Sequence, residues 1–162
     1  MKLLIMGPPG AGKGTQAKIL AQKFNLVHLS TGDILRKEID RNSEVGLKAQ
    51  TYMNAGNLVP DEVLLEMMNS TLTELKDNGV ILDGFPRTIP QADGLSKIFQ
   101  SLNQDIDAII NIEVDKDVLI RRLVERAKNS GRADDTEEVI KNRQNVYFCL
   151  LYTSPSPRDD LW

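Results

Sequence analysis

The chain has 162 residues, 41% of them hydrophobic, and its 20 basic and 23 acidic side chains give a formal net charge of −3. A chain of this length can bury a core of its own, and its balanced charge excludes a broad basic surface for nucleic acid or for an anionic membrane. A single cysteine excludes an internal disulfide and a cysteine-based zinc site, and it is typical of a reducing compartment.

The N-terminal residues predict a buried strand. The apolar run over residues 1–6 is too short for a signal peptide or a membrane span. We therefore expect a cytoplasmic protein without a membrane segment.

A glycine-rich turn, Gly7-Pro-Pro-Gly-Ala-Gly-Lys-Gly-Thr15, follows this strand and matches the phosphate-binding pattern G-x-x-x-x-G-K. In such a turn, backbone N–H groups, the start of the next helix and the lysine all face the same anion. We expect glycines in the turn because a Cβ would keep the backbone away from phosphate oxygens, and these are Gly7, Gly10 and Gly12. Gly14 occupies the usual place of a magnesium-binding hydroxyl, so either Thr15 takes that role or the metal is held through water.

Further strands and helices alternate along the chain. The patterns predict a helix over 13–24, a strand over 26–29, short helices between 33 and 59, a helix from 60 to about 78, a strand over 80–82, a helix up to about 102, a strand over 108–112, a helix over 117–128 and a last helix that ends near Tyr147. This order predicts an α/β fold, with four parallel strands and crossover helices in three layers.

Polar residues follow two of these strands. Asp83 ends the strand over 80–82, at the same edge as the phosphate turn, where it can bind magnesium or its waters; the alternative is a carboxylate that caps the next turn. The residues 30–33 offer capping side chains at a second strand-to-helix turn of that edge. His28 we interpret as a core or boundary residue, because a lone histidine makes no metal site.

Four motifs in order resemble those of adenylate kinases, in the nucleoside monophosphate kinase family. They are the glycine-rich turn, Leu29-Ser-Thr-Gly-Asp-Ile-Leu-Arg36, Leu82-Asp-Gly-Phe-Pro-Arg-Thr-Ile-Pro-Gln91, and Gly131-Arg-Ala-Asp-Asp135 with Arg143. The resemblance covers residues 1–148 and implies a P-loop NTPase-type parallel sheet, a small helical NMP-binding insertion over 30–59 and a short lid over 127–134. It also implies a phosphotransferase of nucleotide biosynthesis that interconverts ATP and AMP with two ADP, using Mg²⁺.

The resemblance further implies a role for individual positions. The ATP-binding residues would be Gly10, Ala11, Gly12, Lys13, Gly14, Thr15 and Arg122. The AMP-binding residues would be Thr31, Arg36, Asn57, Leu58, Val59, Gly84, Arg87 and Gln91, with the arginines on the phosphate and the glutamine on the adenine edge. The catalytic residues would be Lys13, Arg87, Arg126, Arg132 and Arg143. Magnesium would have no direct protein ligand and would be held through water near Asp83, Asp33 and Thr15.

Closure of the site follows from its chemistry. Water would compete with AMP for the phosphoryl group, so we expect the insertion and the lid to close over both substrates. The lid is too short for the metal-bearing form found in longer members of the family, so we expect no structural zinc.

The residues 149–162 depart from the family pattern. They include Pro155 and Pro157 and have no helical or strand period, so we expect a disordered tail, as in a truncated or mis-joined reading frame. After Tyr147 the resemblance implies one more helix, a fifth strand and a terminal helix, and we expect none of them in this chain. Their loss would expose apolar surface on the sheet, so we expect low stability, weak ATP binding and little activity.

Three functions are open at this stage. The first is an adenylate kinase acting on ATP and AMP as a monomer, with no nucleic-acid or membrane partner. The second is a uridylate or cytidylate kinase, although the run Thr88-Ile-Pro-Gln91 favours adenine. The third is a phosphate-loop fragment that binds nucleotide without turnover.

Overall fold

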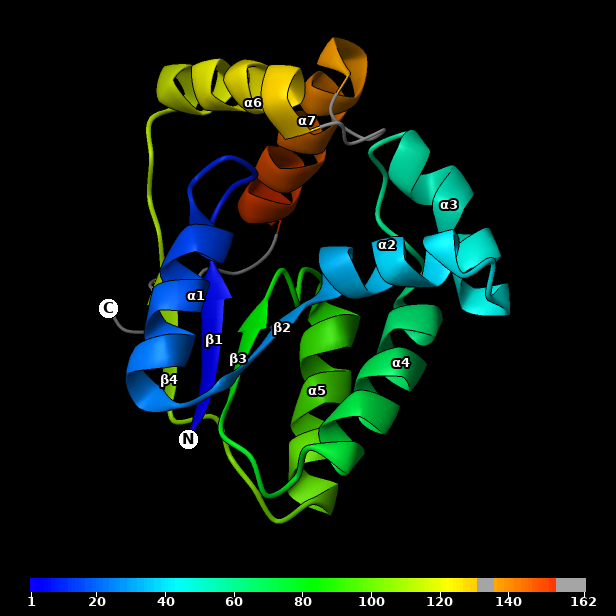
Figure 1. Ribbon diagram of the computed structural model, residues 1–162, viewed down its shortest axis with the longest axis vertical. Coiled ribbons are helices and arrows are strands. Elements are labelled where there is room, and N and C mark those ends of the chain that lie inside the picture. The colour runs from blue at the N-terminus through cyan, green and yellow to red at the C-terminus, as the bar shows by residue number, and fades with distance from the viewer. Residues whose placement is uncertain (131–135, 154–162) are drawn as a thin grey trace.

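The computed structural model describes residues 1–130 and 136–153, which form four strands and seven helices (Figure 1). No helix in this part of the chain is long and apolar enough to cross a membrane. The elements in order are β1 (Lys2–Met6), α1 (Lys13–Phe24), β2 (Val27–Ser30), α2 (Thr31–Asp40), α3 (Glu44–Asn54), α4 (Asp61–Glu74), β3 (Val80–Asp83), α5 (Ile89–Ser101), β4 (Ala108–Asn111), α6 (Lys116–Ser130) and α7 (Glu137–Thr153).

The four strands form one parallel sheet, as the sequence predicts, and the structure shows their order to be β2-β3-β1-β4. Its registers align the ends of the strands, because Asp83 at the end of β3 pairs with Ile5 of β1 on one side and with Ser30 of β2 on the other. The segments that leave β1, β2 and β3 therefore start at one edge of the sheet.

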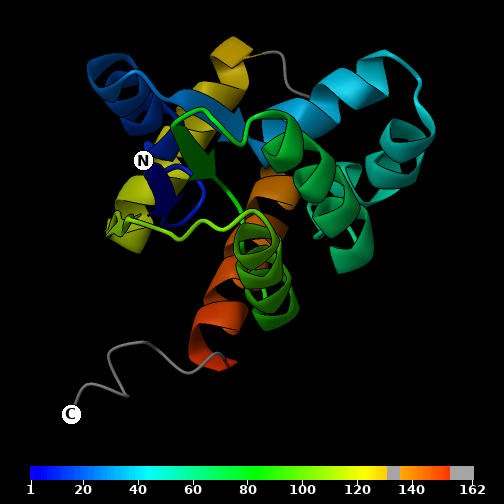
Figure 2. The ribbon, with the colours of Figure 1, turned by 90° about the horizontal axis from the view of Figure 1, so that it is seen from below.

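Successive side chains of the strands point to opposite faces of the sheet and belong to two separate hydrophobic cores. Leu4, Leu29 and Leu82 belong to the larger core, which α4 and α5 cover, whereas Leu3, Ile5 and Ile81 pack with Ala17 and Ala21 of α1 on the other face. Figure 2 shows α4 and α5 side by side on their face of the sheet. This arrangement confirms the predicted three-layer α/β fold.

Two helix ends differ from the prediction. Helix α4 ends at Glu74, not near Asn78, because 3₁₀-type hydrogen bonds tighten its last turn, such as that from the N–H of Lys76 to the carbonyl of Thr73. Helix α7 continues to Thr153 and does not end near Tyr147, since no proline or glycine interrupts it before Pro155. The first residues of the predicted tail are thus helical, and residues 154–162 lie outside the described residues.

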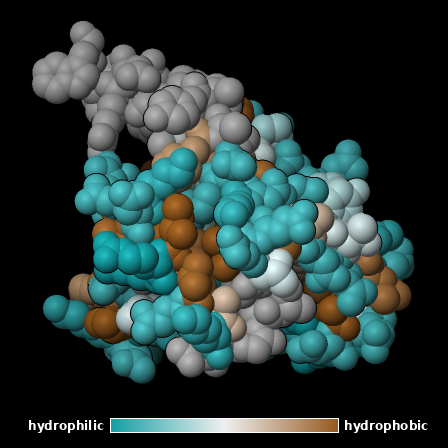
Figure 3. All heavy atoms as spheres, turned by 90° about the horizontal axis from the view of Figure 1, so that it is seen from above, coloured by the Kyte–Doolittle hydropathy of each residue, from teal (hydrophilic) through white to brown (hydrophobic). Residues whose placement is uncertain are grey.

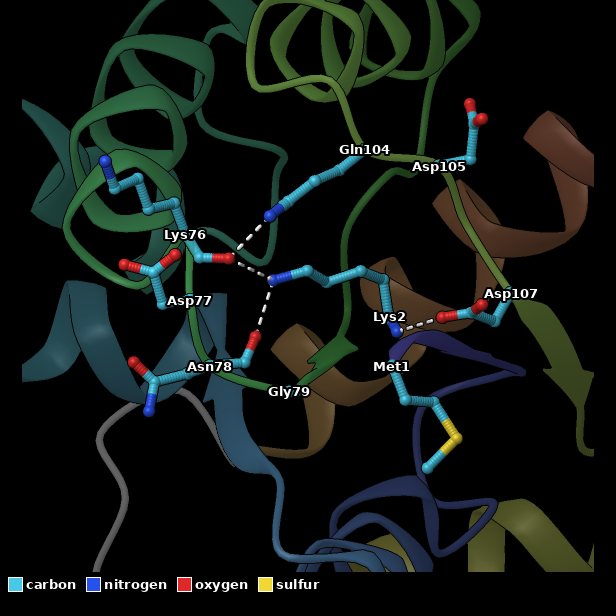
Figure 4. A pocket seen from close by; sticks show the side chains of 9 residues that line it. All are labelled: Met1, Lys2, Lys76, Asp77, Asn78, Gly79, Gln104, Asp105 and Asp107. Carbon is cyan, nitrogen blue, oxygen red and sulfur yellow. Dashed lines mark hydrogen bonds between the residues drawn. The ribbon is translucent and has the colours of Figure 1, made fainter.

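The opposite edge of the sheet is closed by a buried lysine (Figure 4). The Nζ of Lys2 donates to the carbonyls of Lys76 (3.1 Å) and Asn78 (2.5 Å), and its backbone N–H donates to the carboxylate of Asp107 (2.5 Å). A polar pocket of about 420 Å³ lies here. Because it lies at the amino ends of the strands, it is remote from the turns that carry the predicted site residues.

The two cores lead to a stability prediction. Leu82 is completely buried in the central strand β3, so Leu82→Ala removes packed methyl groups and leaves a cavity. We expect it to lower the free energy of unfolding by about 2–5 kcal/mol in urea denaturation. Ile109→Ala on the edge strand β4 is the matched control, since the Ile109 side chain is 59% exposed. Equal losses from both changes would contradict this assignment of the core.

Candidate active site

The topology creates a crevice between β1 and β3. From β1 the chain passes through α1 to β2 at one side of the sheet, and from β3 it passes through α5 to β4 at the other side. Neighbouring strands whose connections leave in opposite directions define the switch point where α/β proteins bind ligands. The glycine-rich turn after β1 and the segment over 84–88 after β3 meet there.

The glycine-rich turn holds its lysine close to its own backbone. The Nζ of Lys13 donates to the carbonyls of Gly7 (2.8 Å) and Pro8 (3.0 Å). Gly12 is the N-cap of α1 with φ 93°, and a Cβ there would meet open space. A Cβ on Gly10 would instead lie 2.9 Å from Leu123, so this glycine is also required by packing within the protein, a reason that the sequence motif does not reveal.

Positive charges are crowded around this lysine. Burial, followed by the charge of Arg87 and the smaller effects of Arg143 and Arg126, lowers the pKa of Lys13 from 10.5 to about 8, although the carboxylate of Asp83 opposes the shift. Arg87 keeps solvent-exposed surface, yet loss of surrounding water and the charge of Arg143 lower its pKa from 12.5 to about 10. Both groups are cationic at neutral pH, so the site concentrates positive charge and is suited to a polyanion.

Asp83 brings a carboxylate to the same place. It is only 8% exposed, and its Oδ2 lies 3.2 Å from the Nε2 of His28. A Cβ on Gly14 would be 3.5 Å from this oxygen, so the carboxylate faces the phosphate turn at the position where related loops carry a metal-binding hydroxyl. The structure places His28 at the boundary of the core.

The donors suit a hydrated magnesium ion better than a fully protein-bound metal. The described residues contain no group of three or more His, Cys, Asp or Glu side chains that could hold a metal. Mg²⁺ typically keeps several waters and needs only one or two carboxylates beside substrate phosphates, and Asp83 is placed for this. Asp33 is instead engaged by the Nη2 of Arg36 at 2.5 Å, and Thr15 is exposed at the start of α1.

Four of the predicted AMP residues come together beside the end of β3. The hydroxyl of Thr31 donates to the carbonyl of Gly84 (3.1 Å), and the Nε of Arg87 donates to the same oxygen (2.6 Å). The charge of Arg36 adds to the lowering of the Arg87 pKa. The guanidinium of Arg87 thus lies near enough to Lys13 to lower its pKa, and that of Arg36 lies near Arg87.

The predicted adenine contact is more enclosed than the sequence implies. Gln91 is fully buried, its Oε1 accepts from the N–H of Arg87 (2.7 Å) and its Nε2 donates to Asp61 (2.7 Å). These partners fix the orientation of the amide, and its second N–H and second lone pair have no exposed surface in this structure. Val59 is 4% exposed and belongs to the larger core, while Asn57 is exposed and Leu58 half-buried between α3 and α4.

The remaining arginines come from the last two helices. Arg126 on α6 and Arg143 on α7 lie close enough to lower the pKa of Lys13, whereas Arg122 is exposed on α6. Arg132 lies outside the described residues.

The molecular face seen from above in Figure 3 is mostly hydrophilic, with a narrow hydrophobic band across it.

Sequence reasoning missed two residues that flank Arg143. Asn142 bonds to the turn between α3 and α4, and Gln144 bonds to the carbonyl of Pro9 in the phosphate turn at 2.9 Å. No local pattern marks them, because their partners are more than 80 residues away in the chain.

The lowered pKa of Lys13 predicts proton uptake on ATP binding. At pH 8.5 a lysine with a pKa near 8 is about three quarters neutral, and phosphate favours its charged form, so binding should take up a proton. Calorimetric titrations with ATP in two buffers of different ionisation enthalpy measure this uptake. At pH 8.5 the apparent binding enthalpy should differ between the buffers. At pH 6.5 the contribution of Lys13 to that difference should nearly vanish, because the lysine is already charged.

Lys13→Arg provides the control for this measurement, because an arginine here stays charged and should abolish the uptake at pH 8.5. Unchanged uptake in this variant, or none in the original chain, would contradict the role given to Lys13.

Comparison with known proteins agrees with this geometry. A family model described as Adenylate kinase matches residues 5–152. The adenylate kinase of Leptospira biflexa is 48% identical over 147 residues, which are 90% of this chain and 79% of that protein. Those of Bacteroides thetaiotaomicron (46% over 156 residues; 96% and 82%) and Prochlorococcus marinus (49% over 146 residues; 90% and 78%) are similar. The chain belongs to the adenylate kinase family.

Proposed function

We propose that this chain transfers the terminal phosphoryl group of ATP to AMP and gives two ADP, in a reversible reaction. The observation that carries the proposal is the crowding of cations around Lys13 at the switch point, where burial, together with the charges of neighbouring arginines, lowers the pKa of both Lys13 and Arg87. Two nucleotides joined through their phosphates relieve the repulsion among these cations. The relatives named adenylate kinase support the choice of reaction.

The site divides into two halves along the β1–β3 crevice. On the ATP side, the glycine-rich turn from Gly10 to Thr15 holds the phosphates through its N–H groups and Lys13, and Arg122 covers the base. On the AMP side, Arg36 and Arg87 bind the phosphate, and Gln91 contacts the adenine edge. The other AMP contacts are Thr31, Asn57, Leu58, Val59 and Gly84.

Catalysis then rests on alignment and charge neutralisation. The transferring phosphoryl group is loose and highly charged, so no general base is required of the protein. Lys13, Arg87, Arg126 and Arg143 surround the transferred group, and we assign Arg132 to the same cluster. When bound, Mg²⁺ would neutralise further phosphate charge near Asp83, through water.

Closure of two segments excludes water from the reaction. The NMP-binding insertion over 30–59 folds over the substrates when both are present, and we expect the same of the lid over 127–134, of which residues 131–134 lie outside the described residues. Helices α2 and α3 form most of the insertion and contact α7 through the turn between α3 and α4. We further propose that the protein acts as a monomer in the cytoplasm, with no nucleic-acid partner.

A pyrimidine acceptor is the less favoured alternative. Relatives at 45–49% identity are named adenylate kinases, and the amide of Gln91 combines the donor and the acceptor that the adenine edge requires. A binding module without turnover is the other alternative, and the same assay tests both.

The decisive measurement is AMP-dependent ADP formation in a coupled assay, with CMP and UMP as competing acceptors. We expect AMP to be the best acceptor. Arg87→Ala should lower the turnover on the order of a thousand-fold, because it removes an arginine from the transferred charge. Lys97→Ala, an exposed cation on α5, should leave the rate unchanged. ADP formation that is independent of AMP, or equal rates with all three acceptors, would refute the proposal.

The closure proposal has its own test. A bisubstrate analogue that joins two adenosines through phosphates should slow hydrogen exchange in residues 30–59 more than in α4 and α5, because the insertion closes over the substrates and these two helices do not. Equal protection of these regions with and without the analogue would contradict closure.

A further inference from the structure

We propose that Asn142 and Gln144 are positioning residues that hold Arg143 in place, by anchoring α7 to the NMP-binding insertion on one side and to the phosphate turn on the other. This inference rests on the proposed function for the role of Arg143, but the two anchors are observed in the chain without substrates. Asn142 and Gln144 bond to different parts of the site, and the charge of Arg143 between them contributes to the lowered pKa of Lys13 and Arg87.

The anchor on the insertion side is formed by Asn142. Its Nδ2 donates to the carbonyl of Ala55 (2.6 Å) and to the Oδ1 of Asn57 (2.9 Å). Between these residues, Gly56 has φ +74° and packs so closely on α7 that a Cβ would lie 2.9 Å from the carbonyl of Val139 and 3.1 Å from the Cγ of Arg143. The turn over 55–57 therefore rests directly on the helix that carries Arg143.

The anchor on the phosphate side is formed by Gln144, which is only 3% exposed. Its Nε2 donates to the carbonyl of Pro9 at 2.9 Å. Lys13 binds the carbonyls of Gly7 and Pro8, so the three carbonyls over 7–9 are all held by cationic or amide donors. A carbonyl oxygen that turned towards a phosphate would repel it, so these donors keep the turn oriented for anion binding.

The other half of the Gln144 amide is unsatisfied. Its Oε1 is buried and has no hydrogen-bond partner among the described residues. A buried acceptor without a partner is costly, and an apolar side chain of similar size would avoid that cost. We infer that the hydrogen bond from the Gln144 N–H to the carbonyl of Pro9 offsets the cost of the unpaired oxygen.

Two anchors on either side of Arg143 fix the rotation of the helix. Successive residues of an α-helix are about 100° apart, so side chains 142 and 144 reach opposite sides while 143 projects between them. A rotation of about 10° moves a side chain that lies about 6 Å from the axis by about 1 Å. A misplacement of this size can cost a reaction about a hundredfold in rate.

Steady-state kinetics test the positioning role. Asn142→Ala should lower kcat about tenfold and raise the KM for AMP, because its lost bonds hold the insertion; Gln144→Met should lower kcat similarly and raise the KM for ATP. The matched controls are Asn145→Ala, an exposed asparagine on the same helix, and Gln100→Met on α5, and both should behave as the original chain. Thermal melting of every variant separates these effects from unfolding.

A double-mutant cycle separates positioning from a structural role. If Asn142 and Gln144 act through Arg143, their substitution should cost little further kcat in an Arg143→Ala background. A loss in that background as large as in the original chain would overturn the positioning role, even if the anchors exist.

Hydrogen exchange tests the anchors without turnover. Asn142→Ala should speed exchange of the amides of Gly56 and Asn57, and Gln144→Met should speed exchange of Ala11, which bonds within the phosphate turn. Unchanged exchange in the ligand-free variants would overturn the inference whatever the kinetics. An unmodified chain that forms no ADP from AMP and ATP would instead refute the proposed function, and these exchange rates would still decide whether the anchors hold.

Discussion

Repulsion among cations at one edge of a parallel sheet is the constraint on which the site depends. Lys13 follows β1, Arg87 follows β3, and Arg143 is carried by the last helix. Burial lowers the pKa of Lys13 and of Arg87, and the charge of Arg143 lowers both further. A fold that assembles such groups has a destabilised, preorganised site before any substrate arrives, and a polyanion relieves the repulsion. Asp83 is the buried carboxylate that offsets part of it.

Hydrophobic burial on both faces of the sheet holds these charges together. Residues alternating along β1 and β3 are buried in two cores on opposite faces, and this burial fixes both the register and the edge from which the loops emerge. Because the ends of β1 and β3 are neighbours and their crossovers leave in opposite directions, the crevice between them is open to ligands. The hydrophobic cores thus stabilise an arrangement that electrostatics alone would disperse.

Contacts of α7 join parts of the site that the sheet does not connect. The helix lies against the insertion through Asn142 and against the phosphate turn through Gln144, with Arg143 between them. Under the proposed function, the two substrates would be held by these two segments, and α7 would link them. The carbonyls of the glycine-rich turn accept hydrogen bonds from Lys13 within the turn and also from Gln144 of α7.

The sequence by itself determined the fold class, the parallel direction of the strands and the phosphate turn, because hydrophobic periodicity and glycine spacing are local signals. It also indicated Asp83 and the arginines, through motifs whose residues are close along the chain. Only the tertiary structure decided that Gln91 is buried with both ends of its amide engaged, that Gly10 is required by Leu123, and that Asn142 and Gln144 flank the site. These features depend on contacts between residues far apart in the sequence. Such contacts produce no periodic pattern of hydrophobic residues, so they cannot be recognised from the sequence alone.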